Sequence, residues 1–518
     1  MSRPNRRREW IDRPGRLGGE PPPRGSTGPS RAQGAERALN RGNDFYALGR
    51  FDEAAASYRE ALRLDPGQVV ALSNLAAVLA QQGELGEAEA SLRRALELRP
   101  DHAEGWSNLG NVLRILGRID EAVACYREAV RLDPGHARAY YNLGTALADR
   151  QDHAAAVPCL EATLRLQPDH VEAHENLAAC WTMLRRPDEA LAHSEEALRL
   201  QPGRARSRWN RAMCWLSLGD YPRGWPEFEW RWGLNGLPRR QFPRPEWDGA
   251  PLEGRTILLH AEQGMGDTFQ FIRYARLVRD RGGTVLVAAQ RPLLRILEGA
   301  PEIDQVVEWG GPLPDFDVHC ALMSLPRVFG TRLETIPADV PYLAPDPGLV
   351  ASWRRELEPI AGFRVGICWA GNPQQPNDRN RSTRLARLAP LAQVPGVHLV
   401  TLQVGPARDQ VREVAGDWPL TDLGGRLDDF AVTAAVIQNL DLVVSIDSAV
   451  AHLAGALGAP VWVALSFAPD WRWLLDRDDS PWYPTARLFR QARPGDWDEV
   501  FRRIAAVLAT RRDQGFPA

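Results

Sequence analysis

The sequence predicts a protein of mixed class, in which an α-helical repeat array precedes two parallel α/β lobes. Three observations lead to this prediction. Prolines recur every 34 residues through the first half of the chain. From residue 255 onward, short apolar runs alternate with helix-like segments, which is typical of parallel sheets. One of these runs, at residues 442–446, ends in an Asp-Ser pair that is suited to opening a helix.

The composition narrows the classes of function. The 518 residues are enough for two to four domains, and the formal net charge of −3 gives no sign of a nucleic-acid partner. No apolar run reaches the length of about eighteen residues that a transmembrane segment needs, so we expect a cytoplasmic protein. The chain has no lysine, which excludes a Schiff-base lysine and the lysine of a P-loop. A phosphate contact therefore has to come from arginine, hydroxyl groups, backbone N–H groups or a metal ion.

Each 34-residue unit of the first half has the pattern of two amphipathic helices. Small residues recur where the helices would cross, and a proline follows the second helix of each unit: Pro66, Pro100, Pro134, Pro168 and Pro202. This pattern resembles the tetratricopeptide repeat and implies an α-solenoid over residues 35–204. Residues 205–236 form a degenerate unit that we expect to cap the array. Residues 1–34 are rich in Arg, Pro and Gly, and we expect a disordered basic tail there.

An asparagine ladder is the second periodic feature of the repeats. Its members are Asn74, Asn108, Asn142 and Asn176, one in the first helix of each successive unit. A resemblance to the repeat-bearing O-linked N-acetylglucosamine transferases implies that the ladder binds the backbone of a peptide acceptor. Hydrogen bonding between neighbouring repeats explains the ladder equally well, so both interpretations stay open at this point.

The second half of the chain divides into two predicted lobes. Residues 237–254 are rich in proline and read as a linker. The alternation of apolar runs and helical segments then places a first lobe at residues 255–347 and a second lobe at residues 348–518.

A glycine-containing turn follows the first apolar run of the first lobe. Gly264 and Gly266 allow the backbone to approach a ligand or a neighbouring helix closely. The turn lacks the third glycine of a dinucleotide-binding site. Asp267 closes the turn, and it is equally suited to capping a helix, which we expect over residues 268–279.

The corresponding turn of the second lobe is Asp447-Ser448-Ala449. It follows a buried apolar run and opens a helix that ends near Gly458. In parallel sheets, ligands bind beyond the carboxyl ends of the strands, where a helix N-terminus can receive a phosphate group. The turn is therefore a candidate phosphate site, with helix capping as the plain alternative.

Four motifs together resemble the heptosyltransferase-type glycosyltransferases, glycosyltransferase family nine. The motifs are the stretches at residues 262–267, 366–373, 377–382 and 445–455. The bacterial proteins that fuse this module to tetratricopeptide repeats are the most similar. The resemblance implies the GT-B arrangement, in which two Rossmann-like lobes face each other. It also implies inverting, metal-independent transfer of a sugar from a nucleotide sugar, with no cofactor.

The resemblance assigns roles to individual residues. Asp267 would be the base that takes the proton of the acceptor hydroxyl, and Glu262 is the alternative base. Asp447 would bind sugar hydroxyls, because a carboxylate and a phosphate repel each other. The other donor-binding residues would be Gly264, Gly266, Arg379, Arg381, Ser448, Ala449 and His452.

Some of these residues have a plain alternative. His452 is one turn into a helix and is also compatible with a satisfied core histidine. Arg379 and Arg381 would offset the charge of the leaving diphosphate, or they belong to a solvated loop. Asp315-Phe-Asp317 matches the metal-binding DxD pattern of another glycosyltransferase fold. With 66 acidic residues a chance match is expected, so we predict no metal site.

Two functions follow from these assignments. In the first, the chain is a glycosyltransferase, and its repeats help to recognise a protein, peptide or glycan acceptor. A protein beginning near Arg255 should then keep donor binding and lose transfer to the acceptor. In the second, the chain is a scaffold in which the repeats are functional and the glycosyltransferase module is degenerate.

Overall fold

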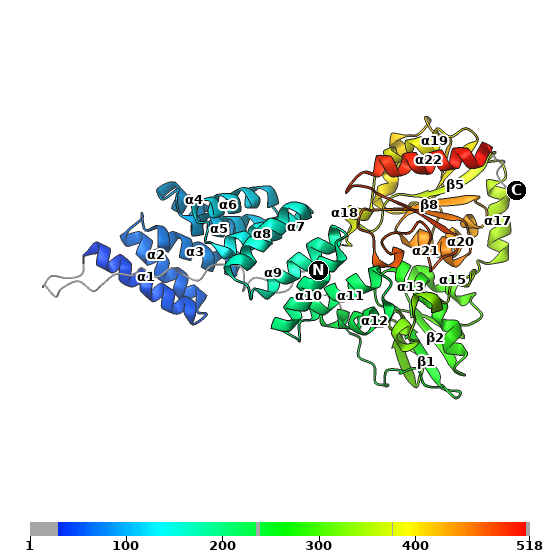
Figure 1. Cartoon of the computed structure of the whole chain (residues 1–518), viewed down its shortest axis with the longest axis horizontal. Helices are drawn as coiled ribbons and strands as arrows, with labels where there is room; N and C mark the ends of the chain where they lie inside the picture. Colours follow the sequence, from blue (N-terminus) through cyan, green and yellow to red (C-terminus); the bar gives the residue numbers. More distant parts are fainter. Residues whose placement is uncertain (1–29, 235–238, 376, 514–518) are drawn as a thin grey trace. The chain divides into compact units, whose positions relative to one another are not determined.

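The computed structural model of the chain describes residues 30–234, 239–375 and 377–513. The chain forms two compact units, Met1–Gly203 and Arg204–Ala518, and Figure 1 shows the helices of the first and the mixed architecture of the second. Most of the predicted tail, residues 1–29, lies outside the described residues. The last residues of the predicted tail, 31–34, are helical and not disordered, because Ser30 caps a helix that begins at Arg31 through a reciprocal capping box with Gln33.

The described part of the first unit consists of helices in consecutive pairs. They are α1 (Arg31–Ala47), α2 (Phe51–Leu64), α3 (Val69–Gln82), α4 (Leu85–Leu98), α5 (Ala103–Ile115), α6 (Ile119–Leu132), α7 (Ala137–Asp149), α8 (His153–Leu166), α9 (Val171–Met183) and α10 (Pro187–Leu200). From α3 onward the pairs begin 34 residues apart, as the proline spacing predicts. The predicted α-solenoid is therefore confirmed.

Small residues mark the places where the two helices of a pair cross. Ala54 and Ala61 of α2 are fully buried. Gly110 of α5 lies so close to Tyr126 of α6 that an added Cβ would come within 2.6 Å of the ring. Equivalent contacts join Gly42 to Tyr58 and Gly144 to Leu160. The glycines of the repeat thus make room for a large residue on the second helix.

The asparagine ladder joins successive repeats inside the array. The hydrogen bonds run from Asn74 to Asn43 (2.9 Å), from Asn142 to Asn111 (3.0 Å) and from Asn176 to the Thr145 hydroxyl (3.1 Å). In each case the side-chain amide donates to the residue 31 positions earlier. All four ladder residues are buried. The side-chain amides of Asn74, Asn142 and Asn176 thus make the hydrogen bonds that the inter-repeat interpretation requires.

Asn108 is the exception within the ladder. The residue 31 positions earlier is Ala77, which offers no side-chain acceptor. The amide N–H of Asn108 therefore makes no ladder bond, and its buried Oδ1 atom, which is an acceptor, has no hydrogen-bond partner among the described residues either. The second repeat therefore leaves a gap in an otherwise regular line of hydrogen bonds.

The second unit begins with α11 (Ala205–Ser217), α12 (Tyr221–Phe228) and η2 (Glu229–Gly233). The helix pair α11–α12 lies at the position predicted for the cap of the repeat array. In the structure its large aromatic residues lie in the hydrophobic core of the second unit, where Trp225 Nε1 donates to the Thr331 carbonyl over 2.9 Å. Burial of these aromatic side chains explains why the pair belongs to the unit that follows it.

The first lobe contains a parallel sheet with the strand order β3-β2-β1-β4. The strands are β1 (Thr256–His260), β2 (Thr284–Ala289), β3 (Gln305–Glu308) and β4 (Val318–Ala321). The helices are α13 (Met265–Phe271), α14 (Ala275–Arg279), α15 (Leu294–Glu298) and α16 (Leu325–Val328). The predicted helix at residues 268–279 begins three residues earlier and is interrupted by a 3-10 turn at Ile272–Tyr274. It begins earlier because Asp267 accepts a hydrogen bond from the Gly264 N–H and so fixes the first turn.

The second lobe contains a larger parallel sheet with the strand order β10-β9-β8-β5-β6-β7. The strands are β5 (Phe363–Cys368), β6 (Val397–Thr401), β7 (Leu420–Asp422), β8 (Leu442–Ile446), β9 (Val461–Leu465) and β10 (Ala486–Arg490). The helices are α17 (Pro347–Leu357), α18 (Asp378–Arg381), α19 (Ala389–Ala392), α20 (Phe430–Ile437), α21 (Ala449–Ala456) and α22 (Trp497–Asp513). The predicted fold class, a solenoid followed by two Rossmann-like lobes, is confirmed.

The strand order reverses beside the first strand of each sheet. The reversal falls between β1 and β4 in the first lobe and between β5 and β8 in the second. Connections leave in opposite directions at such a switch point, and ligands bind in the crevice that results. The Gly264–Asp267 turn follows β1 and the Asp447–Ser448 turn follows β8, so both predicted motifs lie at a switch point.

A buried arginine joins the two lobes. Arg273 is 4% exposed and follows α13 in the first lobe. Its guanidinium donates to the carbonyls of Trp482 (2.6 Å) and Pro337 (3.1 Å) and to the Tyr342 hydroxyl (2.9 Å). The ring centroids of Tyr342 and Tyr483 lie 4.5 and 4.8 Å from its central carbon. Carbonyl dipoles and aromatic faces thus compensate this charge, and no carboxylate contact is recorded for it in the described chain.

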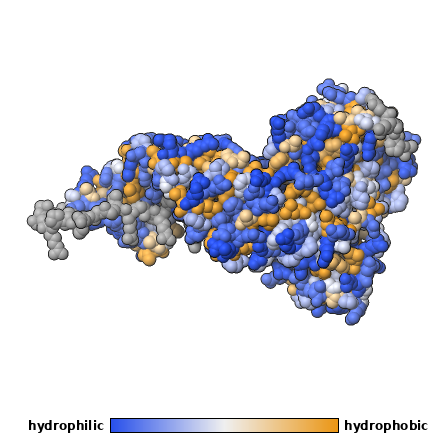
Figure 2. Space-filling model, viewed as in Figure 1, coloured by the Kyte–Doolittle hydropathy of each residue, from blue (hydrophilic) through white to orange (hydrophobic). Residues whose placement is uncertain are grey.

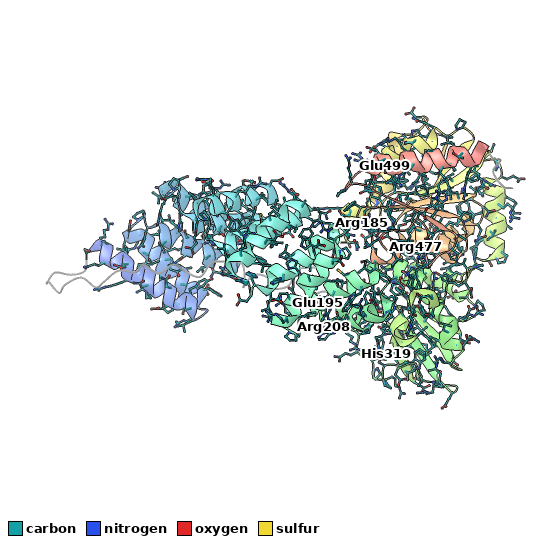
Figure 3. The ribbon with its side chains drawn as sticks, in the orientation of Figure 1. Arg185, Glu195, Arg208, His319, Arg477 and Glu499 are labelled. Atoms are coloured by element: carbon teal, nitrogen blue, oxygen red, sulfur yellow. The ribbon has the colours of Figure 1, made fainter. Side chains whose placement is uncertain are left out.

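The linker covers one face of the sheet of the first lobe. Its Phe242 ring lies 4.9 Å from the ring of His260 and 4.5 Å from that of His319, which Figure 3 labels on the first lobe. Burial lowers the pKa of His260 to about 3, and the neighbouring His319 and Arg240 add to the effect. The linker therefore seals a pair of histidines that stay neutral at neutral pH.

The surface of the chain is mixed in character. On the face drawn in Figure 2, apolar residues are interspersed with hydrophilic ones on both units. Among the helices of residues 30–234, 239–375 and 377–513, none combines the length and the apolar character that crossing a membrane requires.

Candidate active site

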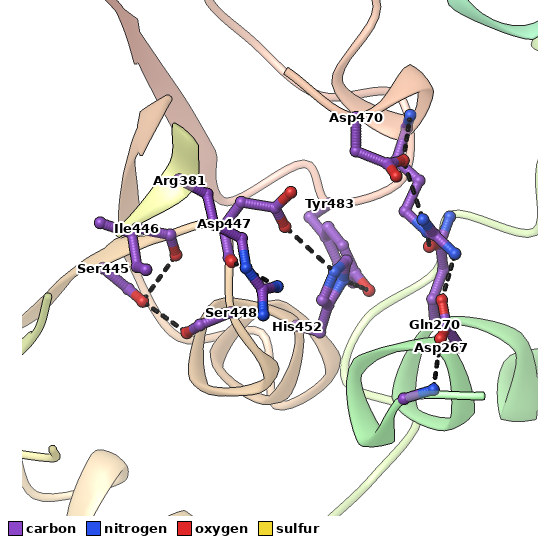
Figure 4. Close-up of polar contacts among 12 residues, drawn as sticks. Asp267, Gln270, Arg381, Ser445, Ile446, Asp447, Ser448, His452, Asp470 and Tyr483 are labelled. Atoms are coloured by element: carbon purple, nitrogen blue, oxygen red, sulfur yellow. Dashed lines mark hydrogen bonds and ion pairs between the residues drawn. The ribbon is translucent and has the colours of Figure 1, made fainter. Parts of the chain in front are cut away.

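The Asp447-Ser448 turn lies where β5 and β8 end side by side. Cys368 at the end of β5 pairs with Ser445 of β8. The Ser448 hydroxyl lies 2.8 Å from the Ser445 hydroxyl and 3.8 Å from Cys368 Sγ, so it points into the sheet (Figure 4). Ser448 occupies the N-cap position of α21, but its side chain caps no N–H group. The first N–H groups of α21, including that of Ala449, therefore have no side-chain cap among the residues described.

Arg381 reaches this turn, whereas Arg379 does not. The Arg381 guanidinium donates to the Asp447 carbonyl over 3.2 Å and to Asp378 over 3.2 Å. Gly371 makes room for it, since a Cβ there would come within 2.5 Å of its Nη2 atom. Arg379 is exposed on the same short helix, α18. Of the two predicted arginines, only Arg381 is therefore placed beside the candidate phosphate site.

His452 links the two lobes at this point. Its Nδ1 atom lies 2.8 Å from the Tyr483 hydroxyl, and its Nε2 atom lies 3.7 Å from an Asp447 carboxylate oxygen. Its ring stacks on Trp473. A Cβ on Gly266 of the first lobe would come within 2.8 Å of the imidazole, so this glycine permits close contact between α13 and α21. His452 is thus a buried, well-partnered residue that also lines the junction of the two turns.

Asp267 lies in the first turn of α13 and both of its carboxylate oxygens are engaged. One oxygen accepts the Gly264 N–H over 2.7 Å. The other accepts from the guanidinium of Arg472, which comes from the second lobe (Figure 4). Asp267 therefore stabilises the helix start from the third helical position, while Gly264 occupies the N-cap, and its carboxylate also pairs with a cation of the other lobe.

Arg472 is the site residue that the sequence analysis missed. It lies in the 3-10 turn Trp471–Trp473, and its side chain is 9% exposed. Besides Asp267, it donates to Asp470 over 2.8 Å and to the Gln270 side chain. The available signal was an arginine between two tryptophans in a chain without lysine, which suggests a cation held in an aromatic environment.

Opposite charges set the protonation states of this cluster. Burial favours a higher pKa for Asp447, but His452 and the guanidinium groups of Arg381 and Arg472 outweigh it, so the pKa of Asp447 lies below its usual value. Burial raises the pKa of Asp470, and Asp447 and Asp267 add to this rise. Burial opposes the charged form of Arg472, yet the three carboxylates keep its pKa above the usual value. Arg472 thus stays positively charged, because several carboxylates surround it.

Glu262, the alternative base, lies at the switch point of the first lobe but is sealed off. Its side chain is 2% exposed and forms a two-pronged ion pair with Arg231 of η2, at 2.9 and 3.0 Å. The Met323 N–H also donates to it over 3.2 Å. Burial raises the pKa of Glu262, and the Arg231 guanidinium opposes that rise. The geometry therefore makes Glu262 part of the link between η2 and the first lobe.

The DxD pattern lies away from the two turns. Asp317 accepts a hydrogen bond from the Thr256 N–H over 2.8 Å at the beginning of β1, which is the opposite end of the strand from Asp267. Asp315 is exposed. A search of the described residues finds no group of three or more histidine, cysteine, aspartate or glutamate side chains that is placed to hold a metal ion.

Comparisons with known families agree with this architecture. Tetratricopeptide repeat models match residues 39–103, 91–124, 110–149, 141–203 and 183–224. The model of glycosyltransferase family 9 (heptosyltransferase) matches residues 386–466, which contain the Asp447 turn and His452. The chain thus combines tetratricopeptide repeats with a segment of the family 9 glycosyltransferase type, and the predicted resemblance is confirmed. The matched segment includes neither Asp267 nor Arg472.

Individual relatives cover parts of the chain. Protein FlbA of Caulobacter vibrioides is 30% identical over 328 residues, which are 57% of this chain and 53% of that protein. The chain therefore spans about half the length of this curated relative. TTC0263, a thermophilic TPR protein of Thermus thermophilus, is 26% identical with a TM-score of 0.30, and the match covers 35% of this chain and 99% of that one. PilF of Pseudomonas aeruginosa is 23% identical with a TM-score of 0.37, and the match covers 40% of this chain and 93% of that one.

Proposed function

We propose that the chain is an inverting, metal-independent glycosyltransferase that takes a sugar from a nucleotide sugar. The observation that carries the proposal is the ion pair between Asp267 and Arg472. It brings a carboxylate from the switch point of one lobe against the cations and the uncapped helix start at the switch point of the other. A base for the acceptor and a receiver for the leaving group therefore lie together at the junction of the two lobes.

In the proposed reaction, the acceptor hydroxyl attacks the anomeric carbon from the face opposite the diphosphate. Asp267 takes the hydroxyl proton as the new C–O bond forms. The bond between the anomeric carbon and the phosphate oxygen breaks, and its electron pair leaves with the nucleoside diphosphate. Arg381, Arg472 and the first N–H groups of α21 offset that charge. Asp447 binds hydroxyl groups of the sugar.

The proposed acceptor is a protein, peptide or glycan that the repeats help to recognise. Support comes from the small first lobe and from the repeats, whose matches indicate a protein-interaction role. The asparagine ladder is engaged inside the array, so the acceptor contacts would come from other repeat residues. A protein lacking residues 1–203 should then bind the donor and fail to glycosylate the acceptor.

The experiment is a survey of nucleotide sugars with the full-length protein. Calorimetry identifies the donor, and release of nucleoside diphosphate measures turnover. We expect Asp267→Asn to lower turnover at least about 100-fold at a temperature where circular dichroism shows the variant to be folded, since loss of the ion pair with Arg472 also lowers its stability. A variant that keeps normal turnover would remove Asp267 from the mechanism.

A second function is supported by one observation. Both carboxylate oxygens of Asp267 are occupied, as expected if the cleft no longer turns over substrate and the repeats act as a scaffold. Under that function, no nucleotide sugar in the survey binds, and the Asp267→Asn variant behaves like the wild type in every assay.

A further inference from the structure

Arg472 has more anionic partners than one cation can neutralise. Its Nη1 and Nη2 atoms donate to Asp470 and Asp267, and its Nε atom donates to Gln270. Asp447 contributes a third nearby carboxylate. The other cation, Arg381, is shared with Asp378. This cluster of side chains therefore has more carboxylates than guanidinium groups, which opposes the entry of a diphosphate unless a cation turns toward it.

Two buried donors beside Arg472 lack acceptors. Gln270 uses its side-chain oxygen to accept from Arg472, and its Nε2 atom is buried without a hydrogen-bond partner among the described residues. Trp473, the next residue after Arg472, has a buried Nε1 atom in the same condition within that part of the chain. A buried N–H group without an acceptor costs free energy. Two such groups beside Arg472 therefore favour the binding of a ligand that supplies acceptors, such as a phosphate oxygen.

We propose that Arg472 is a shared cation, which binds Asp267 in the empty cleft and the diphosphate of the donor in the occupied one. This inference rests on the proposed function and deepens it. A guanidinium binds carboxylates and phosphates through the same planar edge, so the two ligands compete for it. Entry of the donor then frees one oxygen of Asp267.

The exchange gives the reaction an order. Before the donor binds, Asp267 is held by Arg472 and is unavailable to an acceptor hydroxyl. After the donor binds, Arg472 lies on the leaving group and Asp267 keeps only its contact with the Gly264 N–H. The same side chain thus prepares the base and stabilises the leaving diphosphate, and the donor has to bind before the acceptor is activated.

Diphosphate binding to the full-length protein tests the exchange without knowledge of the acceptor. The probes are inorganic pyrophosphate and the diphosphates of uridine, guanosine, adenosine and cytidine, titrated by calorimetry at fixed ionic strength. We expect Arg472→Met to weaken binding of the diphosphate at least about tenfold, because it removes a charge-assisted contact. We expect Asp267→Asn to strengthen binding about three- to tenfold, because it removes the competing carboxylate.

Two further variants make the test specific. In the double variant Asp267→Asn/Arg472→Met, the gain from the asparagine should disappear, since it acts through the arginine. Arg412→Gln removes an exposed arginine of the same lobe and should leave the dissociation constant unchanged. If Arg472→Met does not fold, the sign of the Asp267→Asn effect decides the question.

The outcomes separate this inference from the proposed function. If the wild type binds a diphosphate but Asp267→Asn binds it no tighter, Arg472 is not shared and the glycosyltransferase proposal stands. A gain that persists in the double variant likewise overturns the exchange. If none of the probes binds the wild-type protein, both the exchange and the proposed donor site fail together.

Discussion

Ala77 shows how a single position decides the hydrogen bonding of a whole repeat. Neighbouring positions on the ladder carry Asn43, Asn111 and Thr145, and each accepts from an asparagine of the next repeat. Tyr58 and Tyr126 donate to the same asparagine acceptors, at 2.9 and 2.7 Å. At Ala77 no side chain can accept, so the Asn108 amide N–H makes no bond of the ladder type, and the buried Asn108 Oδ1 atom also lacks a donor among the described residues.

Threonine at position 77 should repair the ladder. Ala77→Thr places a hydroxyl where Thr145 serves Asn176, and Ala77→Val has the same shape without the hydroxyl. We expect the threonine variant to be more stable than the valine variant by about 1 kcal/mol, the usual value of one hydrogen bond. Urea unfolding of the two proteins measures this difference. Equal stability would show that the hydroxyl does not reach Asn108.

His260 gives the chain a stability that depends on pH. Its pKa is about 3 in the folded protein and ordinarily about 6.5, because burial opposes the charged imidazole. Below pH 6.5 the unfolded chain takes up a proton at His260 that the folded protein does not, so the stabilisation of the fold by this neutral histidine is complete above pH 6.5 and is lost as the pH falls toward 3. We expect His260→Gln to unfold with a smaller loss of stability between pH 6.5 and pH 4 than the wild type. Parallel slopes in thermal unfolding would contradict this.

At the scale of elements, η2 is fastened to the first lobe by the ion pair of Arg231 and Glu262. Both side chains are almost completely buried, so neither charge can be solvated by water if its partner is lost. Arg231 also donates to the Ser324 hydroxyl over 2.7 Å. A segment that precedes the sheet in sequence thus supplies the partner of a carboxylate at its switch point.

Removal of one partner of this pair should lower the free energy of unfolding far more than removal of both partners. Arg231→Met leaves the Glu262 carboxylate buried and unpaired, and we expect a destabilisation of about 3–5 kcal/mol. In Arg231→Met/Glu262→Met the buried charge is gone, and we expect most of that stability to return. Chemical unfolding of the two variants checks this. A double variant that is as unstable as the single one would mean that packing, and not charge, fixes η2.

Local patterns predicted most elements, whereas contacts between distant residues had to come from the structure. The apolar run at residues 442–446 and the following turn were located from sequence because strand, cap and helix are neighbours in the chain. Arg472 and Asp267 are 205 residues apart, and no local signal joins them. The same holds for Arg231 and Glu262. The resemblance therefore named Glu262 as an alternative base, and the ion pair that buries it became visible only in the structure.

At the scale of the whole second unit, the helices before the sheet are part of its core. Ala212, Leu216 and Tyr221 belong to the same apolar cluster as the strands of the first lobe. Trp482 of the second lobe donates to the Tyr221 hydroxyl over 3.0 Å. A cut near Arg255, which the sequence suggested, would remove these contacts, and a cut at Arg204 would keep them.

These contacts predict where the unit can be separated from the repeats. A protein of residues 204–518 should unfold in urea as a cooperative unit. A protein of residues 255–518 should have a lower midpoint and expose apolar surface, because α11 and α12 no longer cover the first lobe. Tryptophan fluorescence and dye binding compare the two. Identical midpoints would show that the helix pair adds nothing to the core.

The buried Arg273 determines how the two lobes can move. Separating the lobes at this point would leave a guanidinium in an apolar interior without its carbonyl and hydroxyl acceptors. We therefore expect any rotation of one lobe against the other to keep Arg273 close to its axis. Amide hydrogens around residue 273 should exchange slowly in every state of the protein, while those at the starts of α13 and α21 change their rate when a ligand enters or leaves.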